Sequence, residues 1–285
     1  WICFVCPSCN AKERLLIEII IPLVIALAFG GLGMRAWRGL RGPARSRIQV
    51  GIRLLVVGLV AAMLVAASVW QFSKSRRWQL FGGLITRVET SEPLVALTFD
   101  DGPVARDTEA ILEILATEDV RATFFVTGAE LAENLEAGRQ IAAAGHELGN
   151  HTYSHRQMVG VGYDTVQEEI ERTDALIRAT GYAGPIHIRP PYGKRFIVLP
   201  YYLRVHDRRT IYWDVEPESY KEIAGDSERI AAHVLENVRP GSIVLLHVMG
   251  KNRAVTRQAV PGVIEALTDA GYRLVTVSEL LERAE

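Results

Sequence analysis

One ten-residue stretch, Leu94–Pro103, constrains the fold of this chain more than any other. It begins as an apolar run typical of a buried strand, and Asp100 and Asp101 follow directly before Gly-Pro breaks the strand. Two carboxylates at a strand end are costly to bury without partners. Because successive strand side chains face opposite ways, we expect one carboxylate to bind a metal and the other to move protons. A solvated turn is the alternative, since Asp-Asp-Gly-Pro is ordinary turn chemistry.

Beyond this strand, further apolar runs alternate with helical patterns. Strands are predicted at 94–99, 122–126, 146–151, 186–189, 210–214, 242–247 and 272–277, and helices at 108–116, 129–144, 164–177, 227–238 and 256–270. Asp164 and Ser278 are predicted helix caps. This alternation implies parallel strands with right-handed crossovers. Polar residues follow most of the strands, which favours an α/β barrel of the (β/α)7 type over an open sheet, because strand ends converge on one face of a barrel.

The first 78 residues differ from the rest in being apolar and basic, and we expect them to form a membrane region. Residues 54–72 carry no charge and are long enough to cross a bilayer, whereas 15–34 is a weaker span. The segment between them, 35–53, has six arginines and no acid, so it should stay in the cytoplasm. The chain then divides into 1–78 with one or two transmembrane helices, a connector at 79–93, and an extracytoplasmic domain at 94–285.

Three alternatives concern this leader. Residues 54–72 could instead be a buried core helix. A start at Met34 would leave a single signal-anchor, and cleavage after Ala66-Ala67 would remove it. Cys3, Cys6 and Cys9 have metal-like spacing without a fourth ligand.

The formal net charge of −1 gives no support for nucleic-acid binding.

Two histidines in the third strand region add to the carboxylates. His151 and His155 are four residues apart, which would align both imidazoles on one face of a helical turn. With Asp101 they supply two nitrogens and one carboxylate, leaving positions for water and substrate. This set suits zinc, and also cobalt, nickel, manganese or iron.

The remaining polar residues at strand ends suggest hydrolysis by metal-bound water. Asp100 is predicted to be the general base, or else to hold a histidine tautomer. Arg189 can keep Asp100 ionised, and the Tyr192 amide can donate to an oxyanion. His247 is the predicted general acid, and Glu216 is expected to orient His247 or Arg189. The other histidines are interpreted as structural: His146, His187, His206 and His233.

These residues fall in five ordered motifs, and the domain from about Leu94 to Leu281 resembles the polysaccharide deacetylase family (carbohydrate esterase family 4, NodB homology). The motifs are Thr98–Pro103, His151–His155, Arg189–Gly193, Trp213–Pro217 and Leu245–His247. The resemblance implies a distorted barrel of about seven strands that removes N-acetyl groups with a divalent metal, often zinc. It also implies the roles given above for Asp100, Asp101, His151, His155, Arg189, Tyr192 and His247. Glu216 and Tyr220 depart from the aspartate and tryptophan usual there.

Three functions follow from these observations. The first is a membrane-anchored deacetylase of N-acetylated polysaccharide, such as peptidoglycan or a surface glycan, that needs no nucleotide cofactor. The second is a non-catalytic glycan-binding module on the same fold. The third is a mononuclear iron oxygenase, because two histidines and a carboxylate also describe that site.

Overall fold

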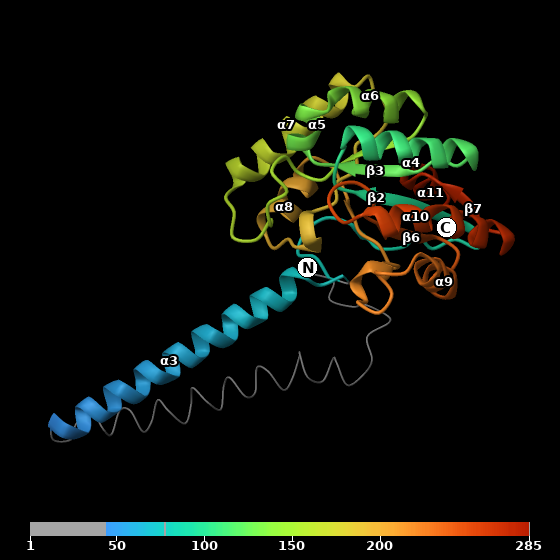
Figure 1. Ribbon diagram of the computed structural model, residues 1–285. Coiled ribbons are helices and arrows are strands. Elements are labelled where there is room, and N and C mark those ends of the chain that lie inside the picture. The colour runs from blue at the N-terminus through green and yellow to red at the C-terminus, as the bar shows by residue number, and fades with distance from the viewer. Residues whose placement is uncertain (1–43, 77, 285) are drawn as a thin grey trace. The chain divides into compact units, whose positions relative to one another are not determined.

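The computed structural model describes residues 44–76 and 78–284 and divides into two compact units between Ser68 and Val69 (Figure 1). Helix α3, Ala44–Ser73, contains a segment, Ile48–Ser73, that is long and apolar enough to cross a membrane. The predicted span 54–72 lies within this helix. The predicted span 15–34 and the three cysteines lie outside the described residues.

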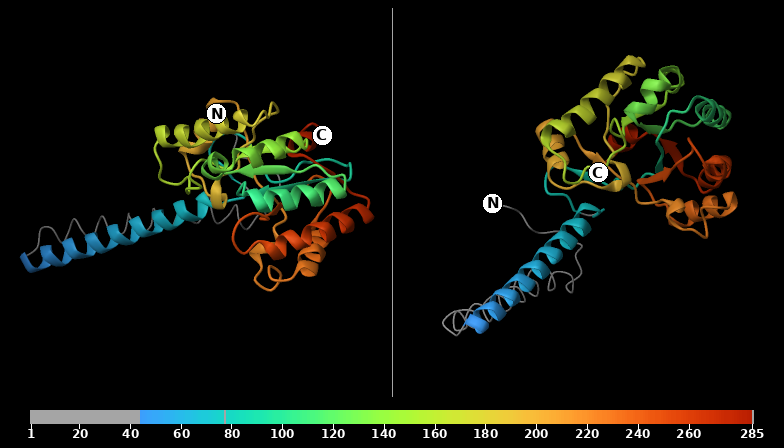
Figure 2. Two further views of the ribbon diagram at one scale, coloured as in Figure 1. Left: turned by 45° about the horizontal axis from the view of Figure 1, so that its top comes forward. Right: turned by 60° about the vertical axis from the view of Figure 1, so that its left-hand side comes forward.

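The second unit is a parallel α/β fold. Its strands are β1 Leu84–Ile85, β2 Leu94–Asp100, β3 Thr123–Val126, β4 Glu147–Asn150, β5 Thr210–Ile211, β6 Ser242–Leu246 and β7 Arg273–Val275. Its helices are α4 Ala105–Thr117, α5 Gly128–Glu133, α6 Leu135–Ala143, α7 Tyr163–Ala179, α8 Val198–Val205, α9 Ser227–Asn237, α10 Ala254–Asp269 and α11 Val277–Leu281. Figure 2, in its right-hand view, shows helices around the outside of the strands.

The strands form a distorted barrel. Four strands pair in the order β4-β3-β2-β6, and β7 pairs with the first half of β2. Isolated bridges complete the circuit: Ile188 bridges Asn150 of β4 and Thr210 of β5, and Val215 bridges Val244 of β6. The predicted fourth strand, 186–189, is therefore reduced to bridges at Ile188, and the predicted fifth strand to two residues and a bridge.

The central strand β2 shows how the sequence divides inside from outside. Val95, Leu97 and Phe99 pack in the larger apolar cluster, with residues of α4, α9 and α10. The alternate residues face the barrel interior, where Leu94 and Ala96 are apolar and Asp100 is charged. The interior thus changes from apolar to polar toward the carboxyl end of β2, and the functional carboxylate lies at the polar end.

Helix α8 was not predicted, and three further helix details differ from the prediction. The segment predicted as one helix at 129–144 is two helices, because Asn134 leaves helical geometry with φ −128° and ψ 46°. The helix that was predicted to be capped by Asp164 has its N-cap two residues earlier, at Gly162, with no side-chain cap. The terminal helix is capped by Thr276, which forms a capping box with Glu279, rather than by Ser278.

The segment predicted as a connector, 79–93, takes part in the barrel. It supplies β1, which pairs with β5, and the Val88 amide donates to the carbonyl of Gly241 (2.9 Å). Gly241 has φ +83°, and a Cβ there would lie 1.8 Å from the Val88 carbonyl oxygen. Only glycine therefore lets this segment approach the start of β6.

We expect Gly241→Ala to destabilise the fold by about 2 kcal/mol or more, since it adds backbone strain and a backbone clash. Chemical denaturation of the full chain in detergent micelles measures this. The control is Gly262→Ala in α10, where a Cβ would meet only the Ala231 Cβ at 3.6 Å. That substitution should be neutral or stabilise by about 0.5–1 kcal/mol. Equal effects at the two glycines would contradict the interpretation.

Candidate metal centre and active site

Asp101, His151 and His155 come together as the sequence predicts. One ligand atom from each lies within 4.8 Å of the other two. The Oδ1 atom of Asp101 is 3.3 Å from His155 Nε2 and 3.9 Å from His151 Nε2. Two imidazole nitrogens and one carboxylate oxygen directed at one point fit a divalent ion and leave coordination positions for water and substrate.

The tautomer of His151 suits metal binding. Its side chain is buried, and Nδ1 lies 2.7 Å from the carbonyl oxygen of Arg189. A carbonyl can only accept, so Nδ1 carries the proton and the Nε2 lone pair faces Asp101 and His155. A backbone acceptor of this kind fixes both ring orientation and tautomer in metal sites.

The two histidines do not lie on a helical turn, contrary to the prediction from their spacing. Residues 151–155 form an irregular loop in which Thr152 has φ +66° and His155 has φ +53°. Asp101 (φ +73°) and Tyr192 (φ +58°) also occupy the left-handed region. Backbone of this kind is strained in residues other than glycine, and such strain gathers at functional sites.

Hydrogen bonds hold the histidine loop in this conformation. Glu169 of α7 accepts from both the amide (2.8 Å) and the hydroxyl (2.6 Å) of Ser154. The Asn150 side chain accepts from the Thr152 amide (2.8 Å) and donates to Asp174 (2.7 Å). None of these supporting residues was predicted, because a loop clamp leaves no periodic signal in the sequence.

The second carboxylate, Asp100, is separate from the ligand set and paired with a buried arginine. Its Oδ1 accepts from Arg189 Nη1 at 2.6 Å, while its Oδ2 lies 3.7 Å from His151 Nε2. Burial by itself would raise the pKa of the Asp100 carboxyl. The charges of Arg189, His151 and His247 and the hydrogen bond from Arg189 together outweigh burial, so the pKa is held below its ordinary value. Asp100 is therefore a carboxylate at neutral pH.

Arg189 is enclosed inside the barrel with an exposed fraction of 0%. Its guanidinium also donates to Thr98 Oγ1 (2.8 Å) and to the Tyr212 carbonyl (3.1 Å). The Phe125 ring lies 4.0 Å from its central carbon. Several N–H donors of the Arg189 guanidinium thus have acceptors, and one face of the guanidinium lies against an aromatic ring. These contacts offset the cost of burying its charge.

His247 follows β6 and is oriented by Glu218, not by Glu216 as the sequence suggested. Glu218 Oε2 lies 2.9 Å from His247 Nδ1 and also accepts from the His247 amide (2.7 Å). Burial acts to lower the pKa of His247. The hydrogen bond to Glu218 and the charge of Asp100 outweigh that effect, so the pKa is raised above its ordinary value. His247 is thereby suited to donate a proton.

Glu216 instead binds Trp213, whose ring lies beside Arg189. Its Oε2 accepts from Trp213 Nε1 (3.0 Å), from Ser219 (2.8 Å) and from Arg76 (2.8 Å). The Trp213 ring lies 5.4 Å from the guanidinium carbon of Arg189, and the Glu216 charge also acts on that guanidinium by raising its pKa against the effect of burial. Two glutamates lie two residues apart in this motif, and sequence alone gave no reason to choose Glu218.

Tyr192 lies at the rim of the site. Its side chain is exposed and its ring centroid is 4.7 Å from that of His155. Among the described residues, none accepts a hydrogen bond from the Tyr192 amide. An amide held rigidly after two prolines and left open to solvent can donate to a developing oxyanion.

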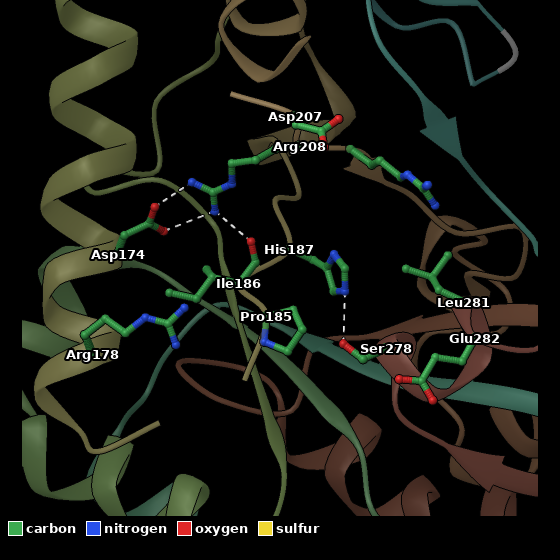
Figure 3. Close-up of a pocket in the computed structure, with 11 residues that line it drawn as sticks. Asp174, Arg178, Pro185, Ile186, His187, Asp207, Arg208, Ser278, Leu281 and Glu282 are labelled. Atoms are coloured by element: carbon green, nitrogen blue, oxygen red, sulfur yellow. Dashed lines mark hydrogen bonds and ion pairs between the residues drawn. The ribbon is translucent and has the colours of Figure 1, made fainter. Parts of the chain in front are cut away.

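An open cavity of about 820 Å³ adjoins the metal centre, with Asp101, Tyr153, His155 and Met249 among its lining residues. A second cavity, of about 620 Å³, shares no lining residue with it (Figure 3). There Arg208 donates to Asp174 and to the Ile186 carbonyl, and His187 meets Ser278 at 3.0 Å. The second cavity has none of the candidate metal ligands in its lining.

Comparisons with known proteins agree with this geometry. The family described as "Polysaccharide deacetylase" matches residues 87–204. A peptidoglycan-N-acetylglucosamine deacetylase of Bacillus cereus is 34% identical, over 67% of this chain and 69% of the relative. A chitooligosaccharide deacetylase of Sinorhizobium fredii is 35% identical over 69% of this chain and 86% of the relative. The peptidoglycan-N-acetylmuramic acid deacetylase PdaC of Bacillus subtilis is 32% identical over 68% of this chain and 40% of the relative.

Solved structures give the same picture. A peptidoglycan N-acetylglucosamine deacetylase in complex with a hydroxamate-type benzamide has a TM-score of 0.65 and 29% identity, covering 70% of this chain and 94% of that one. A CE4 family pseudoenzyme from Bacillus anthracis has a TM-score of 0.63 and 28% identity, covering 70% and 69%. The second structure means that the fold alone does not establish activity, so the catalytic residues must carry that argument.

Removing the buried arginine charge should test the Asp100 pair. We expect Arg189→Met to lower the free energy of unfolding by about 3–5 kcal/mol, because it strands a buried carboxylate. Adding Asp100→Asn should recover part of that loss. Chemical denaturation measures both. Arg139→Met is the control: it breaks an exposed pair with Glu136 and should cost at most about 1 kcal/mol. A cost at Arg189 no larger than at Arg139 would contradict the assignment.

The role of Glu218 can be measured by titration. We expect Glu218→Gln to lower the pKa of His247, since it removes a charged hydrogen-bond acceptor. The proton would then leave His247 at a lower pH than in the unmodified chain. NMR titration of the His247 ring gives this pKa. Glu222→Gln, at an exposed position nearby, should leave it unchanged. A pKa insensitive to Glu218 would refute the pairing.

Proposed function

The chain belongs to the polysaccharide deacetylase family, and from its site we propose that it removes N-acetyl groups from an amino-sugar polysaccharide outside the cytoplasm, such as peptidoglycan or a surface glycan. The observation that carries the proposal is the separation of two charged centres. The ligand atoms of three residues lie within 4.8 Å of one another, and the buried Asp100–Arg189 pair lies beside them without belonging to the ligand set.

The proposed metal ligands are Asp101, His151 and His155. We favour zinc, with cobalt, nickel and manganese as alternatives, because imidazole nitrogens combined with a carboxylate suit these ions. A bound divalent ion would polarise the acetyl carbonyl and lower the pKa of a coordinated water toward about 7.

The chain's own residues would move the protons. Asp100, ionised beside Arg189, takes a proton from the attacking water as the new carbon–oxygen bond forms. The Tyr192 amide donates to the carbonyl oxygen while it carries negative charge. His247, kept protonated by Glu218, gives a proton to the amide nitrogen as the carbon–nitrogen bond breaks, so that acetate and a free amine leave. Glu216 supports this arrangement by holding Trp213 against Arg189.

The substrate is proposed at the level of its class. The named relatives act on N-acetylglucosamine or N-acetylmuramic acid of peptidoglycan and on chitooligosaccharides, which share the N-acetylated amino sugar. The open cavity beside the metal centre leaves room for neighbouring sugars of a polymer. No nucleic acid or nucleotide cofactor enters this chemistry.

Helix α3 supports a location at the cell membrane. Its Ile48–Ser73 segment meets the length and composition of a span, and the arginine-rich stretch before it would remain inside the cell. The catalytic domain would then face outward, where peptidoglycan and surface glycans lie.

The alternatives make different predictions from this site. A non-catalytic module would not need the Asp100 and His247 partners, yet Asp100 has a buried partner in Arg189 and His247 is oriented by Glu218. An iron oxygenase would not need a general acid beside the ligand set, and the named relatives are deacetylases.

Release of acetate from N-acetylglucosamine oligomers tests the proposal. We expect Asp100→Asn to lower the rate by about 10²–10⁴-fold, the usual contribution of a general base. Chelation should abolish release, and zinc, cobalt, nickel or manganese should restore it. Asp269→Asn, at an exposed position on α10, should change nothing.

Two results would overturn the proposal. One is the absence of acetate release from chitooligosaccharide and peptidoglycan with each of the four metals. The other is metal-dependent release that survives Asp101→Ala with an unchanged metal content. Glycan binding that survives chelation and Asp101→Ala would support the binding module, and iron-coupled oxygen consumption would support the oxygenase.

A further inference from the structure

We propose that an exposed apolar stripe beside α8 lies in the interfacial region of the lipid bilayer, so that the catalytic domain rests on the membrane surface. This inference rests on the membrane anchoring proposed above. The interfacial stripe consists of Leu80, Phe81, Tyr163, Ile197, Tyr201 and Val205.

Helix α8 presents two faces of opposite character to its surroundings. Ile197, Tyr201 and Val205, spaced four residues apart, are 43%, 47% and 56% exposed. On the other face, Leu199 and Leu203 are fully buried. A helix apolar on its inner face needs no apolar residues on its outer face, so the outward row requires a partner.

Aromatic side chains from two other segments extend this row. The Phe81 ring is 5.6 Å from the Tyr201 ring, and the Tyr163 ring is 6.5 Å from it. Leu80 is 50% exposed beside Phe81. Aromatic residues with a polar tip, such as tyrosine, are the kind that membrane interfaces favour.

The stripe is continuous with the end of the apolar helix, which is the main argument for lipid as its partner. The Ser73 carbonyl at the end of α3 accepts from the Arg195 amide (3.1 Å), and the Phe72 and Phe196 rings are 6.1 Å apart. Phe196 directly precedes Ile197. If α3 crosses the bilayer, these contacts hold the start of α8 at the point where the span ends.

Arg195 also leaves the chain after α3 little freedom. Its buried guanidinium donates to the carbonyls of Ser75 and Trp78 and to the Gln79 side chain, at 2.8–3.0 Å. The segment that would otherwise be a loose stalk is therefore bound along the domain. If α3 is anchored in the bilayer, a segment bound in this way keeps the domain close to the membrane surface.

The rim of this region has the charge that anionic headgroups require. The ammonium groups of Lys74 and Lys194 lie 4.5 and 4.6 Å from the Trp70 ring. A tryptophan flanked by two lysines combines an interfacial aromatic anchor with attraction to anionic lipid.

The same contacts lead from the interface to the metal centre. Lys194 lies 5.4 Å from the Tyr192 ring, and that ring packs on the metal ligand His155. Glycan that reaches this rim is therefore glycan close to the membrane surface, rather than the outer part of a wall.

The test uses the full chain with Cys3, Cys6 and Cys9 changed to Ser, reconstituted in vesicles of zwitterionic and anionic phospholipid. Single cysteines at Tyr201→Cys, Leu235→Cys or Val60→Cys carry a polarity-sensitive fluorophore. Leu235, an exposed apolar residue of α9, is the matched control. A shallow lipid nitroxide should quench the Tyr201 probe at least about twofold more than the Leu235 probe, as expected of a group at the headgroup level.

Each outcome bears on the inference. Suppose the lipid nitroxide quenches the probe at position 60, but aqueous iodide quenches the probe at position 201 as strongly as the probe at position 235. The domain then does not rest on the bilayer, and the inference is overturned. Quenching between Tyr201 probes on different copies, without lipid quenching, assigns the stripe to a second copy and also overturns it. If Val60 is open to iodide, the membrane anchoring fails together with the inference. Acetate release from a soluble oligomer by each labelled variant tests the proposed activity separately.

Discussion

The structure depends on one charge pair enclosed in a barrel, Asp100 with Arg189. The pair is stable there because the guanidinium also donates to Thr98 and to backbone carbonyls and lies on the Phe125 ring. Arg189 serves the neighbouring ligand set too, since its carbonyl fixes the His151 tautomer. In the proposed mechanism a single residue thus keeps the general base ionised with its side chain and orients a metal ligand with its backbone.

Two of the three proposed metal ligands lie on strained backbone, as does Tyr192 at the rim of the site, and the surrounding fold holds them there. Asp101, His155 and Tyr192 all have positive φ, and Thr152 between the histidines does as well. Buried polar side chains such as Glu169 and Asn150 bond the loop that carries the histidines. Strained loops held by buried hydrogen bonds keep their geometry before substrate arrives, which is what electrostatic stabilisation of a reaction requires.

The segment that follows α3 contacts the proposed active site. Arg195 binds the segment after α3, and Arg76 from that segment reaches Glu216. The segment that follows α3 therefore forms part of the wall of the proposed active site.

The sequence by itself determined the alternation of strands and helices and the identities of Asp100, Asp101, His151, Arg189 and His247, because strand periodicity and residue chemistry are local properties. It did not determine that 186–189 pairs only through Ile188 or that His155 is presented by a left-handed loop. Nor did it distinguish Glu218 from Glu216 as the partner of His247. Those choices belonged to the tertiary structure, since each depends on which groups from distant segments meet within hydrogen-bond distance, and one-dimensional spacing does not encode that distance.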